Sequence, residues 1–243
     1  MKPEEYSIDY GKHSIGYTVV RRIRKTLEIA VEPDSTVSVA APISASPESI
    51  AAKVRKRATW ILAQQRYFDQ FNPRTPARRY VSGETHLYLG RQYRLRVVRS
   101  QSTSVKLMRG TIEIQSRHPE SSEETKALLD KWYKAKARTK FLERIEACLD
   151  RFSRPATVTP RGLAIRVMPK RWGSMSRGGR LSLNLRLIQA PAEAIDYVIT
   201  HELCHRIEPS HSPRYFRILK GALSDWETRK ERLEQILAQN AAR

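Results

Sequence analysis

The sequence predicts an α+β fold in which a β-rich N-terminal part packs with a mostly helical C-terminal core. Alternating apolar and polar residues, the two-residue period of strands, recur through residues 1–118. Helical periodicity dominates residues 119–243, with one further helical run at about 46–70. The 243 residues suffice for one large domain or two smaller ones. We expect either two regions that meet near residue 118 or one continuous domain.

Turn and cap residues place the N-terminal elements. Alternating runs at 27–31 and 37–39 are separated by a Pro-Asp-Ser turn, which predicts a hairpin. Ser46 and Pro47 have the character of an N-cap and a first-turn proline, so one helix should run from there to about Gln70. Further strands are expected at 85–89, 91–98, 104–108 and 111–115.

The C-terminal region is predicted to be built around long helices. Ser121 with Glu124 resembles a capping box, and an amphipathic pattern continues to about Phe152. Strands are expected at 163–168 and 181–184, on either side of a Gly-Gly turn. A last helix should begin near Ser224 or Asp225.

The stretch His-Glu-Leu-Cys-His at 201–205, followed by His211, carries the most chemical information. Three of the six histidines fall within eleven positions. Residues four apart lie on one face of an α-helix, so His201 and His205 can share one metal ion. Glu202 is rotated about 100° from His201, which suits a base acting on metal-bound water better than a ligand. This is the spacing of a hydrolytic zinc site; the alternative is three unrelated helix histidines.

The flanking residues predict a helix with an apolar face on one side and the histidines on the other. A stripe of aliphatic residues at four-residue spacing falls opposite the histidines: Ile195, Ile199, Leu203 and Ile207. Pro209 should end the helix near Glu208. Ser212 and Pro213 resemble the start of a second helix, which leaves His211 at the turn as a third ligand. Glu208 is the alternative third ligand.

Longer motifs around the histidines resemble the YgjP-like family of small bacterial zinc metallopeptidases. The similarity is strong over about 165–235 and looser toward the N-terminus. The motifs that carry it are RWGSMS at 171–176, GRLSLN at 179–184, DYVITHELCH at 196–205 and HSPRYF at 211–216.

The resemblance implies a compact zincin-type fold, with one Zn²⁺ per chain held by His201, His205 and His211, and Glu202 as the base. It also suggests that the strand at 181–184 pairs with an extended substrate. The family usually has Cys where this chain has Met175, so a thiol has no role at that position.

Two other families with the same short motif fit less well. The metzincin pattern needs a Gly where this chain has Glu208, and no methionine follows to build its Met-turn. Peptide deformylase uses an upstream Cys ligand, but the only cysteine upstream is Cys148, inside a long helical pattern.

The expected reaction is cleavage of peptide bonds by Glu-assisted attack of zinc-bound water. A second oxyanion donor is usual, and four residues are candidates for it or for substrate contacts: Tyr197, Tyr215, Arg171 and Asn184. Glu208 and Asp225 are candidates to orient a ligand imidazole from the second shell. Asp196 is a weaker candidate, because helical phase points it away from His201.

The formal charge of +20, spread along the chain, favours polyanions or acidic partners but also suits a solvated surface. Besides a peptide or protein substrate, nucleic acid is therefore a candidate partner. The alternatives are a nucleotide pyrophosphohydrolase that uses the same metal site, or a nucleic-acid-associated protease or binding protein. Against the nucleotide reading, the sequence has no Gly-rich phosphate loop and lacks the acidic clusters usual for magnesium sites.

Composition predicts a cytoplasmic protein that is not embedded in a membrane. Two cysteines cannot build a disulfide framework, and one of them, Cys204, lies inside the metal-binding motif. The first residues contain no apolar signal core, and no uncharged apolar run approaches the roughly 20 residues that a membrane helix needs.

Overall fold

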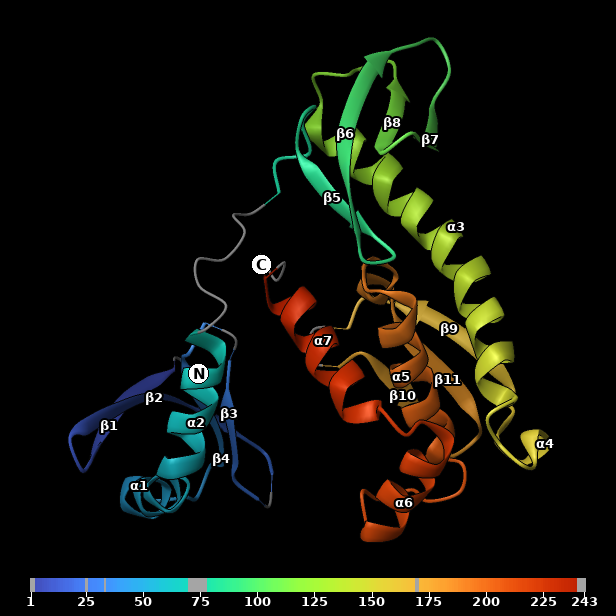
Figure 1. Ribbon diagram of the computed structural model, residues 1–243. Helices are drawn as coiled ribbons and strands as arrows, with labels where there is room; N and C mark the ends of the chain where they lie inside the picture. Colours follow the sequence, from blue (N-terminus) through green and yellow to red (C-terminus); the bar gives the residue numbers. More distant parts are fainter. Residues whose placement is uncertain (1–2, 25, 33, 70–77, 169–170, 240–243) are drawn as a thin grey trace. The chain divides into compact units, whose positions relative to one another are not determined.

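The computed structural model describes residues 3–24, 26–32, 34–69, 78–168 and 171–239 (Figure 1). It confirms an α+β fold. The chain forms two compact units, one of residues 1–76 with 238–243 and the other of residues 77–237. The boundary therefore lies at residue 76, and not near 118 where the sequence suggested it.

The N-terminal unit is a four-stranded sheet with two helices packed against it. Strands β1 and β2 form one antiparallel hairpin, β3 and β4 form the predicted second one, and β2 pairs in parallel with β4. Side chains from the strands and both helices share one hydrophobic core, including Val19, Val39, Ile50 and Ile61. The elements are β1 (Glu4–Tyr10), β2 (His13–Arg22), β3 (Glu28–Val31), β4 (Val37–Pro42), α1 (Pro47–Lys56) and α2 (Ala58–Asp69).

The single helix predicted for 46–70 is two helices. Ser46 caps α1 as expected, its side chain accepting from Ser49 N–H. At Arg57 the backbone leaves the helical region (φ −102°, ψ 4°), and its N–H bonds to the carbonyls of Lys53 and Val54. Apolar periodicity continues across this break, because both helices bury side chains in the same core, so the pattern alone could not reveal it.

The larger unit joins two sheets through one long helix, α3 (Ser122–Leu149). Its four-stranded sheet has the order β5-β6-β8-β7. Leu95, Ile112 and Ile114 of that sheet share the core of Leu129 on α3, which is why these strands belong to the larger unit. The strands are β5 (Thr85–Tyr88), β6 (Arg91–Arg99), β7 (Ser104–Met108) and β8 (Thr111–Ser116).

The second sheet of this unit has the order β10-β11-β9. The predicted strands are β9 (Gly162–Arg166) and β11 (Arg180–Asn184), which pair in parallel. Between them in sequence lies β10 (Gly173–Met175), which forms an antiparallel hairpin with β11 around the Gly-Gly turn. β10 is therefore an edge strand, and β11 lies in the middle of the sheet. The short helices α4 (Pro155–Val158) and η1 (Leu185–Gln189) connect these strands to their neighbours.

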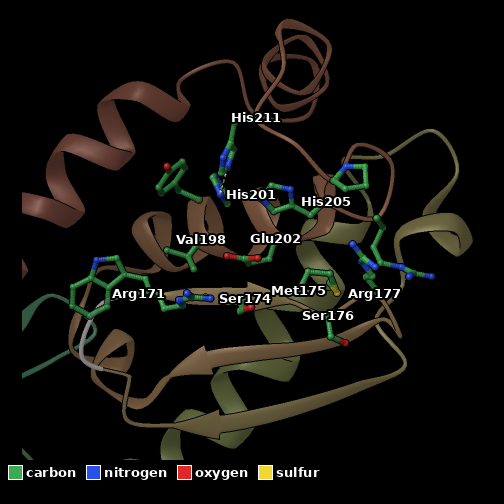
Figure 2. Close-up of a pocket in the computed structure, with 15 residues that line it drawn as sticks. Arg171, Ser174, Met175, Ser176, Arg177, Val198, His201, Glu202, His205 and His211 are labelled. Atoms are coloured by element: carbon green, nitrogen blue, oxygen red, sulfur yellow. Dashed lines mark hydrogen bonds between the residues drawn. The ribbon is translucent and has the colours of Figure 1, made fainter. Parts of the chain in front are cut away.

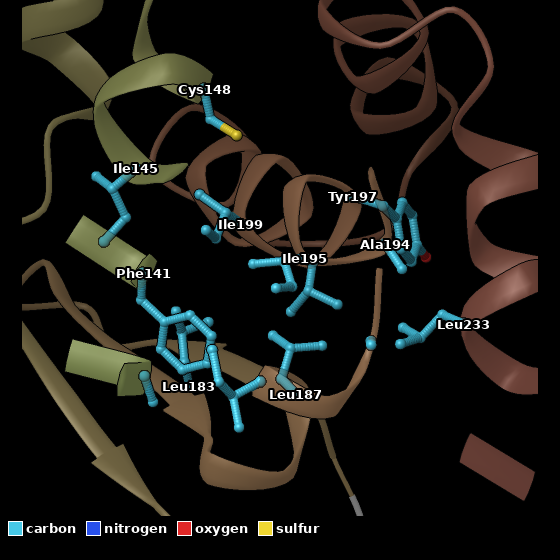
Figure 3. Close-up of a cluster of buried hydrophobic side chains, with 14 of the residues drawn as sticks. Phe141, Ile145, Cys148, Leu183, Leu187, Ala194, Ile195, Tyr197, Ile199 and Leu233 are labelled. Carbon is cyan, nitrogen blue, oxygen red and sulfur yellow. The ribbon is translucent and has the colours of Figure 1, made fainter. Parts of the chain in front are cut away.

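Helix α5 (Ala192–Cys204) carries the histidine motif and packs its apolar side into the core (Figure 3). Ile195, Ile199 and Leu203 are fully buried, beside Phe141 of α3 and Leu183 of β11. The α-helix ends earlier than the predicted Glu208. Beyond Cys204 the chain tightens into a turn in which the N–H groups of 206 and 207 bond to carbonyls three residues back. Ile207 therefore leaves the aliphatic stripe and is 38% exposed.

Two helices complete the C-terminal half. The predicted cap at Ser212 is present, its side chain accepting from Tyr215 N–H at 3.3 Å. The helices are α6 (Pro213–Ala222) and α7 (Trp226–Gln239). None of the helices in the described ranges is long and apolar enough to cross a membrane.

A buried carboxylate connects α5 to its neighbours. The Asp196 side chain is only 3% exposed and accepts hydrogen bonds from the guanidinium groups of Arg144 and Arg151. Arg229 of α7 lies 3.7 Å from the same carboxylate. Asp196 thus joins α5 to α3, to the turn that follows α3, and to α7, on the side away from the histidines.

Candidate metal centre

Three imidazoles converge on one point (Figure 2). His201 lies on the last turn of α5, His205 is its C-cap, and His211 lies in the turn before α6. One ligand nitrogen from each ring lies within 4.8 Å of the others, and the Nε2 atoms of His201 and His211 are 3.1 Å apart. Tetrahedral zinc with Zn–N bonds of about 2.1 Å would hold its ligand nitrogens about 3.4 Å apart. The cluster therefore has about the size that a zinc ion requires.

The protonation states of the ligands also suit a metal. Burial, together with the neighbouring imidazoles, lowers the pKa of His201 to about 3. Burial likewise lowers the pKa of His211. The Nδ1 atom of His205 lies 3.2 Å from the carbonyl oxygen of Glu208; because a carbonyl only accepts, Nδ1 carries a proton, which leaves Nε2 as the atom for a metal. Imidazole nitrogens are common zinc ligands, so the donor set fits the ion.

Tyr215 packs against the three-histidine cluster and holds it in place. Its side chain is fully buried, its hydroxyl donates to the backbone carbonyl of His201 at 3.1 Å, and its ring stacks on His205 with centroids 4.7 Å apart. Burial raises the pKa of this phenol, so it stays protonated. Tyr215 was a candidate oxyanion donor from sequence; here its hydroxyl donates its proton to the backbone of helix α5.

Glu202 lies between α5 and the edge strand β10. It is 7% exposed, and burial raises the pKa of its carboxyl group to about 7, against the opposing effects of the Met175 N–H and the Arg171 charge. A Cβ at Gly173 would lie 2.7 Å from Glu202 Cγ and 2.8 Å from its Oε1. Only glycine at position 173 lets the carboxylate approach the strand this closely.

The cluster and Glu202 line one pocket of about 950 Å³. Of the other sequence candidates, Tyr197 and Arg171 line it as well. Asn184 is outside the lining; its amide donates to the carbonyls of Met168 and Arg171.

Glu208 and Asp225, the residues expected to orient a ligand imidazole, are placed differently. Glu208 reaches His205 through its backbone carbonyl, while its carboxylate accepts from Ser210. The carboxylate of Asp225 accepts from Arg229 at 2.9 Å and is 53% exposed.

One comparison with known proteins identifies the family. A family model described as YgjP-like, metallopeptidase domain, matches residues 25–236. The chain belongs to this family. Neither among curated proteins nor among solved structures was a match found. The match covers the three histidines, Glu202 and the Gly173 strand, so the YgjP-like assignment and the pocket geometry concern the same residues.

The open edge of the three-stranded sheet beside the pocket belongs to β10, and not to the 181–184 strand for which the sequence suggested substrate pairing. Strand β11 is paired on both sides, with β10 and with β9. Asn184 N–H bonds to Trp172 O and Ser176 N–H to Arg180 O, so alternate β10 residues turn their backbone groups toward β11. Gly173 and Met175 consequently turn theirs toward the open edge, beside Glu202. The sequence did not predict β10, because a strand of three residues is too short to show the two-residue alternation of apolar and polar side chains.

Gly173 offers a test of the close approach. Gly173→Ala is expected to lower kcat/KM about 100-fold or more while zinc stays bound, because the new methyl must displace the Glu202 carboxylate. Gly162→Ala is the matched control, since a Cβ there meets no atom within 4 Å. Steady-state kinetics with zinc content measured in parallel would check this. Equal kinetics for the two variants would show that the glycine has no part in placing Glu202.

Proposed function

We propose that this protein is a zinc metallopeptidase that cleaves peptide bonds in extended segments. One observation carries the proposal: three converging imidazoles and a buried glutamate meet in one pocket beside an open strand edge. A structural zinc would have no need of Glu202. The family match supports a metallopeptidase in general terms.

The positions of the three histidines and of Glu202 in the pocket suggest a separate role for each. His201, His205 and His211 would hold zinc, which when bound activates water and polarises the scissile carbonyl. Glu202 takes the proton from the attacking water and passes it to the leaving amine. A carboxyl group with a pKa raised by burial is suited to both steps, because it accepts and returns a proton readily.

The open edge of β10 would position the substrate. The Met175 N–H hydrogen-bonds to the Glu202 carboxylate. The backbone groups of Gly173 and the carbonyl of Met175, which do not bond to β11, can pair with an extended peptide, as in other strand-addition complexes. Of the oxyanion candidates, Tyr197 and Arg171 line the pocket and remain proposed donors. Tyr197 also packs against His201, with ring centroids 5.9 Å apart.

Purified without chelator, the protein is expected to contain one zinc ion per chain. His211→Ala should weaken zinc binding by more than about 100-fold, since even the loss of an outer partner costs 10- to 100-fold. His118→Ala is the control, because that imidazole is exposed and outside the cluster. Metal mass spectrometry and competition with a chromophoric chelator measure both. A zinc-free protein, or equal affinity in the two variants, would refute the ligand assignment.

The activity itself is tested with unfolded proteins, unstructured peptides and nucleoside triphosphates side by side. Peptide cleavage that stops on chelation and returns with zinc would support the proposal. Exclusive hydrolysis of nucleoside triphosphates would replace it with the pyrophosphohydrolase alternative. The arginine side chains of the pocket are the one observation that favours this second candidate.

A further inference from the structure

Three of the arginines that line the pocket form no salt bridge within the described part of the chain. They are Arg171 before β10, Arg177 after it, and Arg206 after α5. Within the described ranges, no carboxylate makes a salt bridge with any of them. Among the described residues that line the pocket, Glu202 is the only one with an acidic side chain. The cleft therefore has a surplus of positive charge even before a metal ion is added.

Arg206 is held in place although it has no anionic partner. Its guanidinium lies 3.3 Å from the position of a Cβ at Gly179, so it packs over the β10–β11 turn. Its Nε is buried and has no hydrogen-bond partner within the described part of the chain. A buried N–H without an acceptor costs free energy, so packing, and not a hydrogen bond at Nε, holds this side chain in place.

The other two guanidinium groups bracket the edge strand. Figure 2 shows Arg171 near one end of β10 and Arg177 near the other, with Ser174 and Met175 between them and Glu202 facing the strand. At about 3.3 Å per residue, the six steps from Arg171 to Arg177 span at most about 20 Å. An extended peptide on this edge would thus pass one arginine before the scissile bond and meet Arg177, with Arg206, after it.

We propose that the pocket selects peptide segments that carry Asp or Glu on both sides of the scissile bond. This rests on the proposed peptidase function. Planar guanidinium groups bind carboxylates in a bidentate manner, so they recognise acidic side chains as well as attract them. A peptide is favoured over a nucleic acid because the strand between the arginines turns the backbone groups of Gly173 and the carbonyl of Met175 away from β11, where they can pair with an extended peptide backbone.

The test is binding to zinc-loaded Glu202→Gln protein, in which cleavage is blocked. The probes are two fluorescent decapeptides that differ only in Glu or Gln at the positions flanking the centre. The acidic peptide should bind about tenfold more tightly or better, and less so at high salt. Adding Arg177→Gln or Arg206→Gln should remove most of that difference. Arg180→Gln should keep it, because Arg180 is exposed on the same hairpin but outside the pocket.

Equal affinity for the two peptides, or a preference that survives both arginine variants, would overturn the inference. The inference would also be overturned if a single-stranded oligonucleotide bound in a manner that depends on Arg177 and Arg206, while the acidic peptide bound no more tightly than its Gln counterpart. Cleavage by the wild-type protein separates the two proposals. If neither peptide is cut but the acidic preference in binding depends on the arginines, the peptidase assignment fails and the acidic-ligand site stands. If both peptides are cut equally, the peptidase assignment stands and the proposed preference for acidic segments fails.

Discussion

Glu202→Gln is expected to reduce kcat by about 10²- to 10⁴-fold while one zinc ion per chain stays bound. The amide keeps the size and the polarity of the side chain but cannot take a proton from water. Because Glu202 is not one of the three converging ligands, the metal should remain. The measurement is single-turnover cleavage of a peptide, with zinc content determined on the same samples.

A matched control is Glu231→Gln, an exposed glutamate on α7, which should leave kcat unchanged. Loss of zinc in Glu202→Gln would mean that the carboxylate takes part in metal binding. Retention of full activity would remove Glu202 from the proton transfers altogether.

The second large effect concerns stability. Asp196→Ala is expected to lower the free energy of unfolding of the larger unit by about 3 kcal/mol. The substitution leaves three arginine side chains facing one another around a buried position. They are 20–24% exposed, so water can compensate for part of the loss, and we expect the lower end of the range for a broken buried ion pair.

Urea unfolding followed by tryptophan fluorescence measures this, because three of the four tryptophans lie in the larger unit: Trp132, Trp172 and Trp226. Asp225→Asn is the control. Its carboxylate also pairs with Arg229 but is 53% exposed, so its loss should cost less than about 1 kcal/mol. Similar effects for the two variants would show that burial of Asp196 adds nothing to the ion pairs.

The sequence predicts elements well where periodicity and caps agree. Ser121 and Ser212 both begin the helices expected of them, and most predicted strands appear close to their expected bounds. The long-range arrangement was not predictable in the same way. The strands at 85–116 resemble the N-terminal strands in pattern, yet they pack on α3, since the choice of partner depends on shape across the whole core.

In the candidate site, the grouping of the three histidines and Glu202 could be predicted, because their spacing places them on one helix and the turn after it. The rest depends on contacts between segments. Gly173 is indistinguishable in sequence from a turn glycine, and its closeness to Glu202 appears only in three dimensions. Arg177 and Arg206 were hidden in a chain with 45 basic residues, where no single arginine stands out.

The open edge of β10 also bears on self-association. An unpaired strand edge is a template for a second copy of the chain as much as for a substrate. β10 is only three residues long, and the guanidinium groups of Arg171 and Arg177 lie at its two ends. Two such edges would bring like charges together, which opposes pairing between copies. The same charges that we assign to selecting acidic segments would thus keep the edge from aggregating, and this protection should weaken as salt screens it.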